Sequence, residues 1–275
     1  MRTLVLTNHK GGCAKTTTAM NLAVVLATEG HRVLAIDLDP QGNLSVALGA
    51  DLEELETTQR TSLRMMLDRN GDYKEYLTKA RHRLDLIPAC LDFDGQYMLE
   101  GQPVSRDLML KDKLNAAQFA YDYCIVDTPP SLNSLTLNAL SMSDMTIIPI
   151  ESSLFALVGL NSLLTMIGRV RRAHAQEMII MALSTMHVPR QNHDKDVRSI
   201  VIKRFTPENV FEATIPRSVA VSQAITNRLS VYESDSASPA AISFLNLAKE
   251  IEHIFSEESV PDISTTIQPQ SRSIN

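Results

Sequence analysis

The chain has 275 residues, a length that fits one large α/β unit. Hydrophobic residues make up 44% of it, which excludes wholesale disorder, and a net charge of −6 argues against a protein that coats nucleic acid with its whole surface. The three cysteines show no C-x-x-C spacing, so we expect buried thiols in a reducing compartment and neither a disulfide framework nor a cysteine metal site.

The first predicted element is a strand that runs into a glycine-rich loop. Residues 3–7 are apolar or β-branched, a glycine pair follows, and Lys15-Thr16-Thr17 open a stretch with helical spacing. Strand, loop and helix in this order are typical of a phosphate-binding loop, whose backbone N–H groups and helix dipole attract a phosphate. We expect Lys15 to reach the β- and γ-phosphates of a nucleotide and the Thr16 hydroxyl to bind Mg²⁺. The predicted nucleotide-binding residues of this segment are Lys10, Gly11, Gly12, Cys13, Ala14, Lys15, Thr16 and Thr17.

Two positions depart from the general loop pattern G-x-x-x-x-G-K-[ST], because His9 stands at the first glycine and Ala14 at the second. Residues 10–16 (KGGCAKT) instead resemble the deviant Walker A motif of the ParA/MinD class of ATPases. The resemblance implies that Lys10 crosses a dimer interface to the nucleotide of a partner subunit and that Lys10 and Lys15 are catalytic. A solvated loop lysine is the alternative for Lys10. The class usually has glycine where Ala14 stands, so we expect near-helical backbone there rather than a left-handed residue.

The next strand is predicted over residues 32–37, a continuous apolar run of the kind that is buried in a parallel sheet. It ends in two aspartates, Asp37 and Asp39, which could simply form the turn before Pro40. The segment 37–43 (DLDPQGN) also resembles the motif that the ParA class has at this place. That resemblance implies that Asp39 is catalytic and positions or activates the attacking water, while Asp37 supports the Mg²⁺ shell or the loop.

A third acid, Asp127, ends the strand that is predicted to begin at Tyr123. The carboxyl edge of a sheet is where a Walker B carboxylate holds a Mg²⁺-bound water, although an aspartate at this point can also be a cap. We therefore predict Mg²⁺ contacts at Thr16, Asp37 and Asp127.

The rest of the chain predicts three more strands and a closing helix, over residues 145–150, 178–183, 210–215 and 239–255. The apolar run 145–168 contains one charge, Glu151, and we favour its division into a strand and a helix over a membrane span. The family resemblance places the adenine beside the last two strands, at Met186 and Pro216, where apolar packing is the alternative. The buried face of the closing helix is predicted at Ile242, Leu245, Ala248 and Ile251.

These elements predict an α/β fold in a single domain over residues 1–255, a P-loop NTPase with a doubly wound, mostly parallel sheet and helices on both faces. A polar, disordered tail is expected over residues 256–275.

Residues 169–228 contain ten basic and five acidic side chains and are net positive. ParA-like proteins without an N-terminal DNA-reading domain bind DNA without sequence preference as ATP-bound dimers, and this chain opens directly on a strand. The family often has a further arginine where this chain has Ala220, and an acid where it has Ser153. Resemblance and local charge together give four candidate DNA contacts, for which a solvated basic face is the alternative: Arg190, Lys203, Arg204 and Arg217.

The resemblance thus implies a Mg²⁺-dependent ATPase that forms a homodimer with ATP, binds non-specific DNA and positions or segregates a cargo. A ParB-like or cargo adaptor protein would stimulate hydrolysis, and we expect a cytoplasmic, nucleoid-associated protein without a membrane contact. A MinD-like membrane-cycling ATPase would need a basic C-terminal helix, and this terminus is acidic. An iron–sulfur carrier would need paired cysteines. A nucleotide-binding adaptor without significant hydrolysis stays open.

Overall fold

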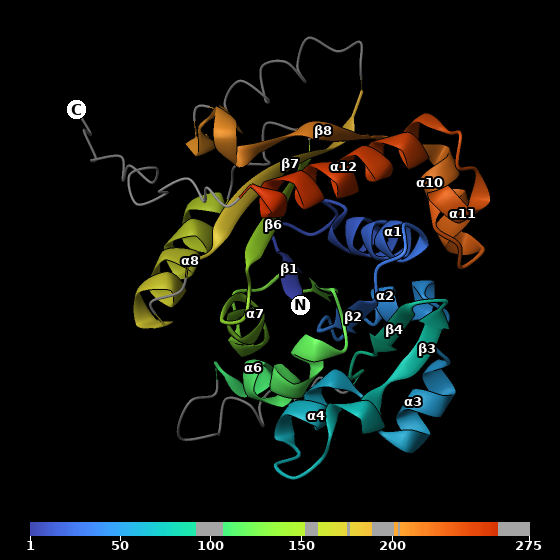
Figure 1. Cartoon of the computed structure of the whole chain (residues 1–275), viewed down its shortest axis with the longest axis vertical. Helices are drawn as coiled ribbons and strands as arrows, with labels where there is room; N and C mark the ends of the chain where they lie inside the picture. Colours follow the sequence, from blue (N-terminus) through green and yellow to red (C-terminus); the bar gives the residue numbers. More distant parts are fainter. Residues whose placement is uncertain (92–106, 152–158, 175–176, 189–200, 203, 258–275) are drawn as a thin grey trace.

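The computed structural model describes residues 1–91, 107–151, 159–174, 177–188, 201–202 and 204–257 (Figure 1). The strands form one eight-stranded sheet in the order β3-β4-β2-β5-β1-β6-β7-β8, in which only the β3–β4 pair is antiparallel. The mostly parallel sheet predicted from the sequence is confirmed. The strands are β1 (Arg2–Leu6), β2 (Val33–Asp37), β3 (Thr78–Arg81), β4 (Leu84–Ile87), β5 (Tyr123–Asp127), β6 (Met145–Glu151), β7 (Ile179–His187) and β8 (Val210–Pro216).

Helices cover both faces of this sheet. The described α-helices are α1 (Lys15–Thr28), α2 (Asn43–Ala47), α3 (Leu52–Thr58), α4 (Ser62–Leu67), α6 (Met109–Leu114), α7 (Ser134–Leu140), α8 (Leu160–His174), α10 (Val219–Thr226), α11 (Val231–Ser234) and α12 (Pro239–Ser256). Short 3₁₀ helices are η1 (Tyr73–Tyr76), η2 (Asn115–Phe119) and η4 (Pro207–Asn209). Figure 1 shows α1, α10, α11 and α12 on one side of the sheet and α4, α6, α7 and α8 on the other.

The core has two layers because successive side chains of a strand point to opposite faces of the sheet. In β1, Leu4 and Leu6 join the layer that contains Phe244 of α12, whereas Val5 joins the layer that contains Leu163 of α8. Every residue of β2 and β5 is buried, as the continuous apolar runs predicted. The sequence pattern therefore identified the central strands correctly.

The carboxyl ends of the central strands meet at one edge of the sheet. Leu6 of β1 and Asp37 of β2 both pair in register with Asp127, the last residue of β5. β1 lies between β5 and β6, so the chain leaves β1 at the place where a doubly wound sheet reverses its strand order. Open α/β sheets bind their ligands in the crevice at a reversal of this kind.

The apolar run after Met145 is divided between two elements. β6 ends at Glu151 and α8 begins at Leu160, with residues 152–158 outside the described part of the chain. None of the helices in the described residues has the length and apolar character needed to cross a membrane. The division into strand and helix is confirmed.

The closing helix α12 buries two of the four side chains that were predicted for its inner face, since Ala248 and Ile251 are 1% and 0% exposed. Ile242 is 46% exposed and Leu245 is only partly buried. Phe244 and Leu247 are fully buried instead, because α12 packs against β8 and α1 through these larger side chains. The helix itself ends at Ser256, while the disorder expected for 256–275 stays a prediction, since 258–275 lie outside the described residues.

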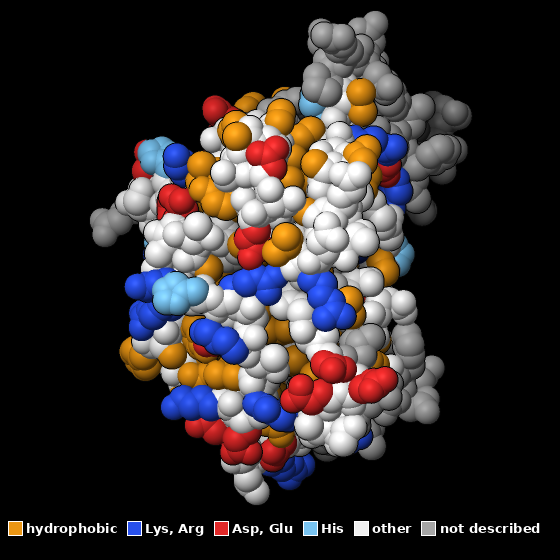
Figure 2. All heavy atoms as spheres, turned by 90° about the vertical axis from the view of Figure 1, so that its right-hand side faces the viewer, with side chains coloured by type: hydrophobic (Ala, Val, Ile, Leu, Met, Phe, Trp, Pro, Cys, Tyr) orange, Lys and Arg blue, Asp and Glu red, His pale blue; other side chains and the backbone are white. Residues whose placement is uncertain are grey.

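Figure 2 shows the face that carries α10, α11, β3 and α3, with lysine and arginine side chains in a band across its middle. Part of this charge is neutralised, because Arg81 lies 2.7 Å from Glu233 and Lys79 lies 2.9 Å from Asp85. The basic residues of β3, of the turn after β3 and of the turn after α10 are Lys79, Arg81, Arg83 and Arg228. The band was not predicted as a DNA contact.

Candidate nucleotide-binding site

The glycine-rich loop between β1 and α1 is hydrogen-bonded to the ends of β6 and β7. Asn8 Nδ2 donates to the Pro149 carbonyl of β6 at 2.7 Å, and Asn8 Oδ1 accepts from the Lys10 amide at 3.1 Å. Farther along the loop, Thr185 Oγ1 of β7 donates to the Cys13 carbonyl at 3.0 Å. Neither Asn8 nor Thr185 was predicted, although both belong to strands or strand ends that neighbour the loop. The loop is therefore preorganised by the sheet.

Ala14 adopts a left-handed conformation, with φ 68° and ψ 30°, immediately before the first residue of α1. The prediction of near-helical backbone at this position was wrong. The chain makes its turn into α1 here, as it does at Gly12 (φ 75°), and a β-carbon at such a residue costs roughly 1–2 kcal/mol. The geometry that glycine would favour is thus kept although the residue is alanine.

The start of α1 has the properties of an anion site. Ala14 provides no side-chain cap, and the first turn contains no acidic residue. The first backbone N–H groups of a helix have no partner within the helix, and they lie at the positive end of its dipole. In this chain they belong to Lys15, Thr16 and Thr17, three of the predicted phosphate-binding residues.

Lys15 is buried beside these N–H groups, with 7% of its surface exposed. Its Nζ donates to the Lys10 carbonyl at 3.4 Å, which is a long contact. Its charge also favours ionisation of the Asp127 carboxyl. A buried ammonium requires compensation by negative groups, and the phosphates of a nucleotide would supply it.

Asp127 lies at the end of β5, opposite the first turn of α1. The Thr16 hydroxyl donates to Asp127 Oδ2 at 2.6 Å, while Oδ1 is buried without a hydrogen-bond partner in the described structure. Burial first, and then the charge of Asp37, raise the pKa of the Asp127 carboxyl well above its usual range.

The donor set fits Mg²⁺, which prefers oxygen ligands and keeps several waters. A hydroxyl and an unsatisfied carboxylate oxygen lie side by side at Thr16 and Asp127. Within the described residues, no three His, Cys, Asp or Glu side chains are close enough to form a metal site by themselves. A magnesium ion here would therefore depend on phosphate oxygens and water as well as on Thr16 and Asp127.

Asp37 and Asp39 are brought together by the turn that follows β2. Asp37 Oδ2 accepts from the amide and the hydroxyl of Ser45, both at 2.8 Å, and Oδ1 accepts from the Asp39 amide at 3.1 Å. These contacts favour the loop-supporting role of Asp37 over direct Mg²⁺ ligation. Burial raises the pKa of Asp37 to about 6. Asp39 is 7% exposed, and its Oδ1 accepts from the Gln41 amide at 3.0 Å.

Lys10 points to a carboxylate of its own chain. Its Nζ lies 2.6 Å from Glu151 Oε2, and Arg217 Nη2 lies 3.6 Å from Oε1 of the same side chain. Sequence reasoning missed Glu151 as a site residue. The available signal was its place as the lone charge in the apolar run 145–168, directly after a predicted strand.

The two predicted adenine neighbours lie at the same sheet edge. Met186 is half-buried, with φ 53°, and directly follows Thr185, which bonds to the loop. Pro216 is half-buried and pairs in register with His187. Their contact with a base stays a prediction.

The candidate DNA contacts are only partly described. Arg190 and Lys203 lie outside the described residues. Arg204 donates to the Asn161 side chain of α8, whereas Arg217 faces Glu151. The two described arginines thus make separate contacts, and a shared DNA surface stays a prediction.

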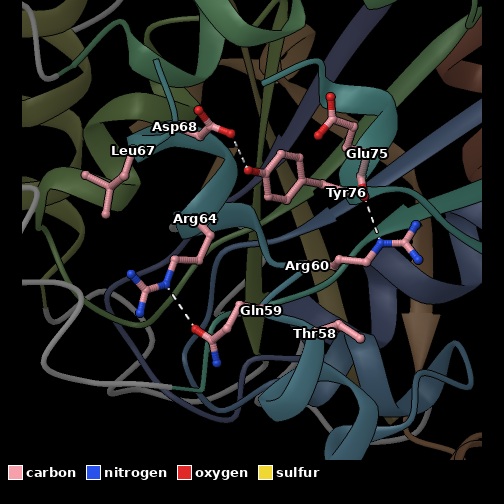
Figure 3. Close-up of a pocket in the computed structure, with 8 residues that line it drawn as sticks. All are labelled: Thr58, Gln59, Arg60, Arg64, Leu67, Asp68, Glu75 and Tyr76. Atoms are coloured by element: carbon pink, nitrogen blue, oxygen red, sulfur yellow. Dashed lines mark hydrogen bonds between the residues drawn. The ribbon is translucent and has the colours of Figure 1, made fainter. Parts of the chain in front are cut away.

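Figure 3 shows a pocket of about 450 Å³ between α3, α4 and η1. Its polar groups bond to one another: Tyr76 Oη donates to Asp68 Oδ2 at 2.8 Å, and Arg64 Nε donates to Gln59 Oε1 at 3.0 Å. The guanidinium groups of Arg60 and Arg64 point away from each other in Figure 3. The pocket therefore provides no convergent anion site and does not belong to the phosphate loop.

Comparison with known proteins agrees with this geometry. Residues 1–180 match the sequence profile of a family described as AAA domain. The chain is 36% identical over 254 residues to the chromosome partitioning protein ParA of Caulobacter vibrioides, covering 91% of this chain and 94% of that protein. It is also 36% identical to the sporulation initiation inhibitor protein Soj of Bacillus subtilis, covering 90% and 97%.

Among solved structures, cobyrinic acid a,c-diamide synthase from Mycobacterium smegmatis with bound ADP and magnesium has a TM-score of 0.81 and 29% identity, covering 94% of this chain and 97% of that one. The P-loop NTPase fold is thereby shown. The paired loop lysines, the Thr16–Asp127 contact and the extent of the match to ParA and Soj lead to one conclusion: this chain belongs to the ParA/MinD family of partition ATPases.

Proposed function

We propose that this protein hydrolyses ATP with Mg²⁺, dimerises around the nucleotide, binds DNA without sequence preference in that state, and positions or segregates a cargo. A ParB-like or cargo adaptor protein would stimulate hydrolysis. The observation that carries the proposal is the contact of Thr16 with Asp127, whose second oxygen is buried and unsatisfied beside an uncapped helix start. A hydroxyl, a carboxylate and a buried lysine at a phosphate loop are the groups that phosphoryl transfer needs.

Each residue has a definite task in this proposal. The N–H groups at the start of α1 and the Lys15 ammonium hold the phosphates, which fixes the γ-phosphoryl group for attack in line. Asp39, held in its turn by Gln41 and Asp37, accepts a hydrogen bond from the attacking water and orients it. When bound, Mg²⁺ neutralises charge on the β- and γ-phosphates. Lys10 contributes a further positive charge to the nucleotide of the partner subunit.

The relatives support the cellular part of the proposal by what their names say. ParA of Caulobacter vibrioides is a chromosome partitioning protein, and the Mycobacterium smegmatis structure contains ADP and magnesium. Both align with this chain over more than nine-tenths of its length. We therefore propose the same nucleotide and metal for this chain, and DNA as the surface on which it acts.

The direct test is Mg²⁺-dependent release of phosphate from ATP, measured with and without duplex DNA, with Lys15→Ala as the matched control. Lys15→Ala should lose nucleotide binding, because it removes the charge that compensates the phosphates. We expect turnover by the parent protein above the Lys15→Ala background, and faster turnover with DNA and an adaptor. Nucleotide binding without turnover in any of these conditions would instead indicate an adaptor without hydrolysis.

The same preparation separates the DNA-bound from the membrane-bound mode of action. Sedimentation with duplex DNA is compared with sedimentation with anionic phospholipid vesicles, each with ATP and without it. ATP-dependent retention on DNA supports the proposal. Retention on vesicles alone would replace it with a MinD-like cycle.

A further inference from the structure

Glu151 faces two cations that come from distant parts of the chain. It is the last residue of β6, which pairs with β1, and β1 leads into the loop that carries Lys10. Its Oε2 lies 2.6 Å from Lys10 Nζ, and its Oε1 lies 3.6 Å from Nη2 of Arg217, which follows β8. The Lys10 and Glu151 side chains are 28% and 21% exposed, whereas that of Arg217 is 66% exposed. The pair with Lys10 is therefore short and partly buried, and the pair with Arg217 is loose and solvated.

We propose that Glu151 is a positioning residue that retains Lys10 within its own subunit until a dimer forms, and that Arg217 then takes over the Glu151 carboxylate. This inference depends on the proposed function, because it assumes that Lys10 reaches the nucleotide of a partner subunit.

The first step concerns the place of the Lys10 ammonium. To reach a phosphate bound to a second chain, Lys10 gives up a carboxylate that lies 2.6 Å away in its own chain. The energy of the Lys10–Glu151 pair thus opposes dimerisation. Glu151 and the phosphate on the second chain compete for Lys10. The Glu151 carboxylate therefore raises the concentration of nucleotide or of protein at which the dimer forms.

The second step concerns the carboxylate that Lys10 leaves behind. Removing one partner of a partly buried pair is costly because a charge stays without compensation. Arg217 reduces this cost, since it already lies on the other carboxylate oxygen and its exposed side chain is free to approach more closely. Arginine suits the task because its planar guanidinium can donate to both oxygens at once.

The test measures dimer formation by sedimentation velocity with a non-hydrolysable ATP analogue and Mg²⁺, in the absence of DNA. Glu151→Gln keeps the size of the side chain and removes its charge. If the pair is worth about fivefold for each subunit, the dimer dissociation constant falls by about 25-fold, because two lysines are released for each dimer. Glu151→Asp, which keeps the charge, should stay near the parent value.

Two controls accompany these variants. Glu29→Gln makes the same charge change at an exposed residue at the far end of α1 from the loop, and it should leave the dissociation constant unchanged. Thermal melting verifies that every variant is folded. An unchanged constant in Glu151→Gln would overturn the inference.

Arg217→Ala tests the takeover. It should weaken the dimer in the parent protein by about threefold or more for each subunit, and it should have no effect in the Glu151→Gln background. An equal effect in both backgrounds would show that Arg217 acts elsewhere and would remove it from the mechanism. Lys10→Ala separates the two levels of the argument. If Lys10→Ala dimerises as the parent does, the proposed role of Lys10 itself is wrong; if it does not dimerise and Glu151→Gln still equals the parent, only the role of Glu151 is wrong.

Discussion

The Thr16 hydroxyl donates to Asp127 Oδ2 at 2.6 Å and so ties the first turn of α1 to the end of β5. This bond satisfies one oxygen of a fully buried carboxylate, while Oδ1 has no hydrogen-bond partner in the described structure. An unpartnered buried polar atom destabilises the fold on its own account. Its presence is explained if the site is complete only with nucleotide and Mg²⁺, and stability should then depend on pH and on the ligand.

The first prediction concerns Asp127→Asn. Burial raises the pKa of Asp127, and of Asp37 to about 6, above the value of about 3.9 expected in the unfolded chain. The folded state therefore binds protons more tightly at both carboxyls, so their contribution to stability is fully present below about pH 4 and is lost as the pH rises through the raised pKa values, which for Asp37 is about 6. Asp127→Asn should be more stable than the parent by on the order of 1–2 kcal/mol at about pH 7.5 without nucleotide, and no more stable at about pH 4. Urea unfolding at both pH values measures this.

Asp122→Asn provides a control of opposite sign. Its bond with Arg32 lowers the pKa of Asp122 to about 2, so its contribution is present above the unfolded value and is lost only as the pH falls towards 2. The Asp122→Asn variant should lose stability at neutral pH.

Asp127→Asn should also lose the rise in melting temperature that we expect Mg²⁺ and ATP to give the parent. A less stable Asp127→Asn protein at neutral pH would contradict the proposed cost of the carboxylate.

The sequence predicted the sheet and the acids at its edge because both depend on local patterns. Apolar runs marked β2 and β5, and the acids that end these strands meet at one edge in a parallel sheet. The pattern was less informative where long-range packing decides. Glu151 could not be assigned to Lys10 without knowing that β6 lies beside β1, and the buried row of α12 depends on which side chains reach β8 and α1.

The second prediction follows from the one local expectation that failed. Ala14 is left-handed although it carries a β-carbon, so Ala14→Gly should relieve strain and stabilise the folded protein by about 1 kcal/mol. For a chain of this size, a gain of that order raises the melting temperature by roughly 2–4 °C. Nucleotide binding should be retained, because the backbone conformation of the loop does not change.

Ala173→Gly makes the same chemical change in the last turn of α8, where the alanine is exposed and helical. There the substitution should destabilise by up to about 1 kcal/mol. Melting curves of the two variants should therefore move in opposite directions. A lower melting temperature for Ala14→Gly would show that the left-handed conformation carries no strain.

The third prediction assigns hydrolysis to Asp39. Asp39→Ala should bind ATP with the affinity of the parent and hydrolyse it about 100-fold or more slowly, since it removes the group that orients the attacking water. Asp39→Asn keeps an acceptor for the Gln41 amide and is the matched control for the shape of the turn. Equal loss in both variants would attribute the effect to the missing carboxylate charge. Phosphate release at the parent rate in Asp39→Ala would remove Asp39 from the mechanism.

The fourth prediction tests the proposed DNA surface in a variant that is expected to stay in the proposed ATP-bound dimer. In the Asp39→Ala background, Arg190→Glu should reduce retention on non-specific duplex DNA without changing ATP affinity. Each lost phosphate contact lowers the slope of log affinity against log salt by roughly 0.9, so the loss of one contact from each subunit lowers it by about 2. Lys79→Glu makes an equal charge change at a β3 side chain that is 64% exposed. If DNA binding follows net charge alone, both variants weaken it equally; if it follows a defined footprint, only Arg190→Glu changes the slope. A loss confined to Lys79→Glu would move the DNA contact from the segment around Arg190 to the face formed by β3 and α10.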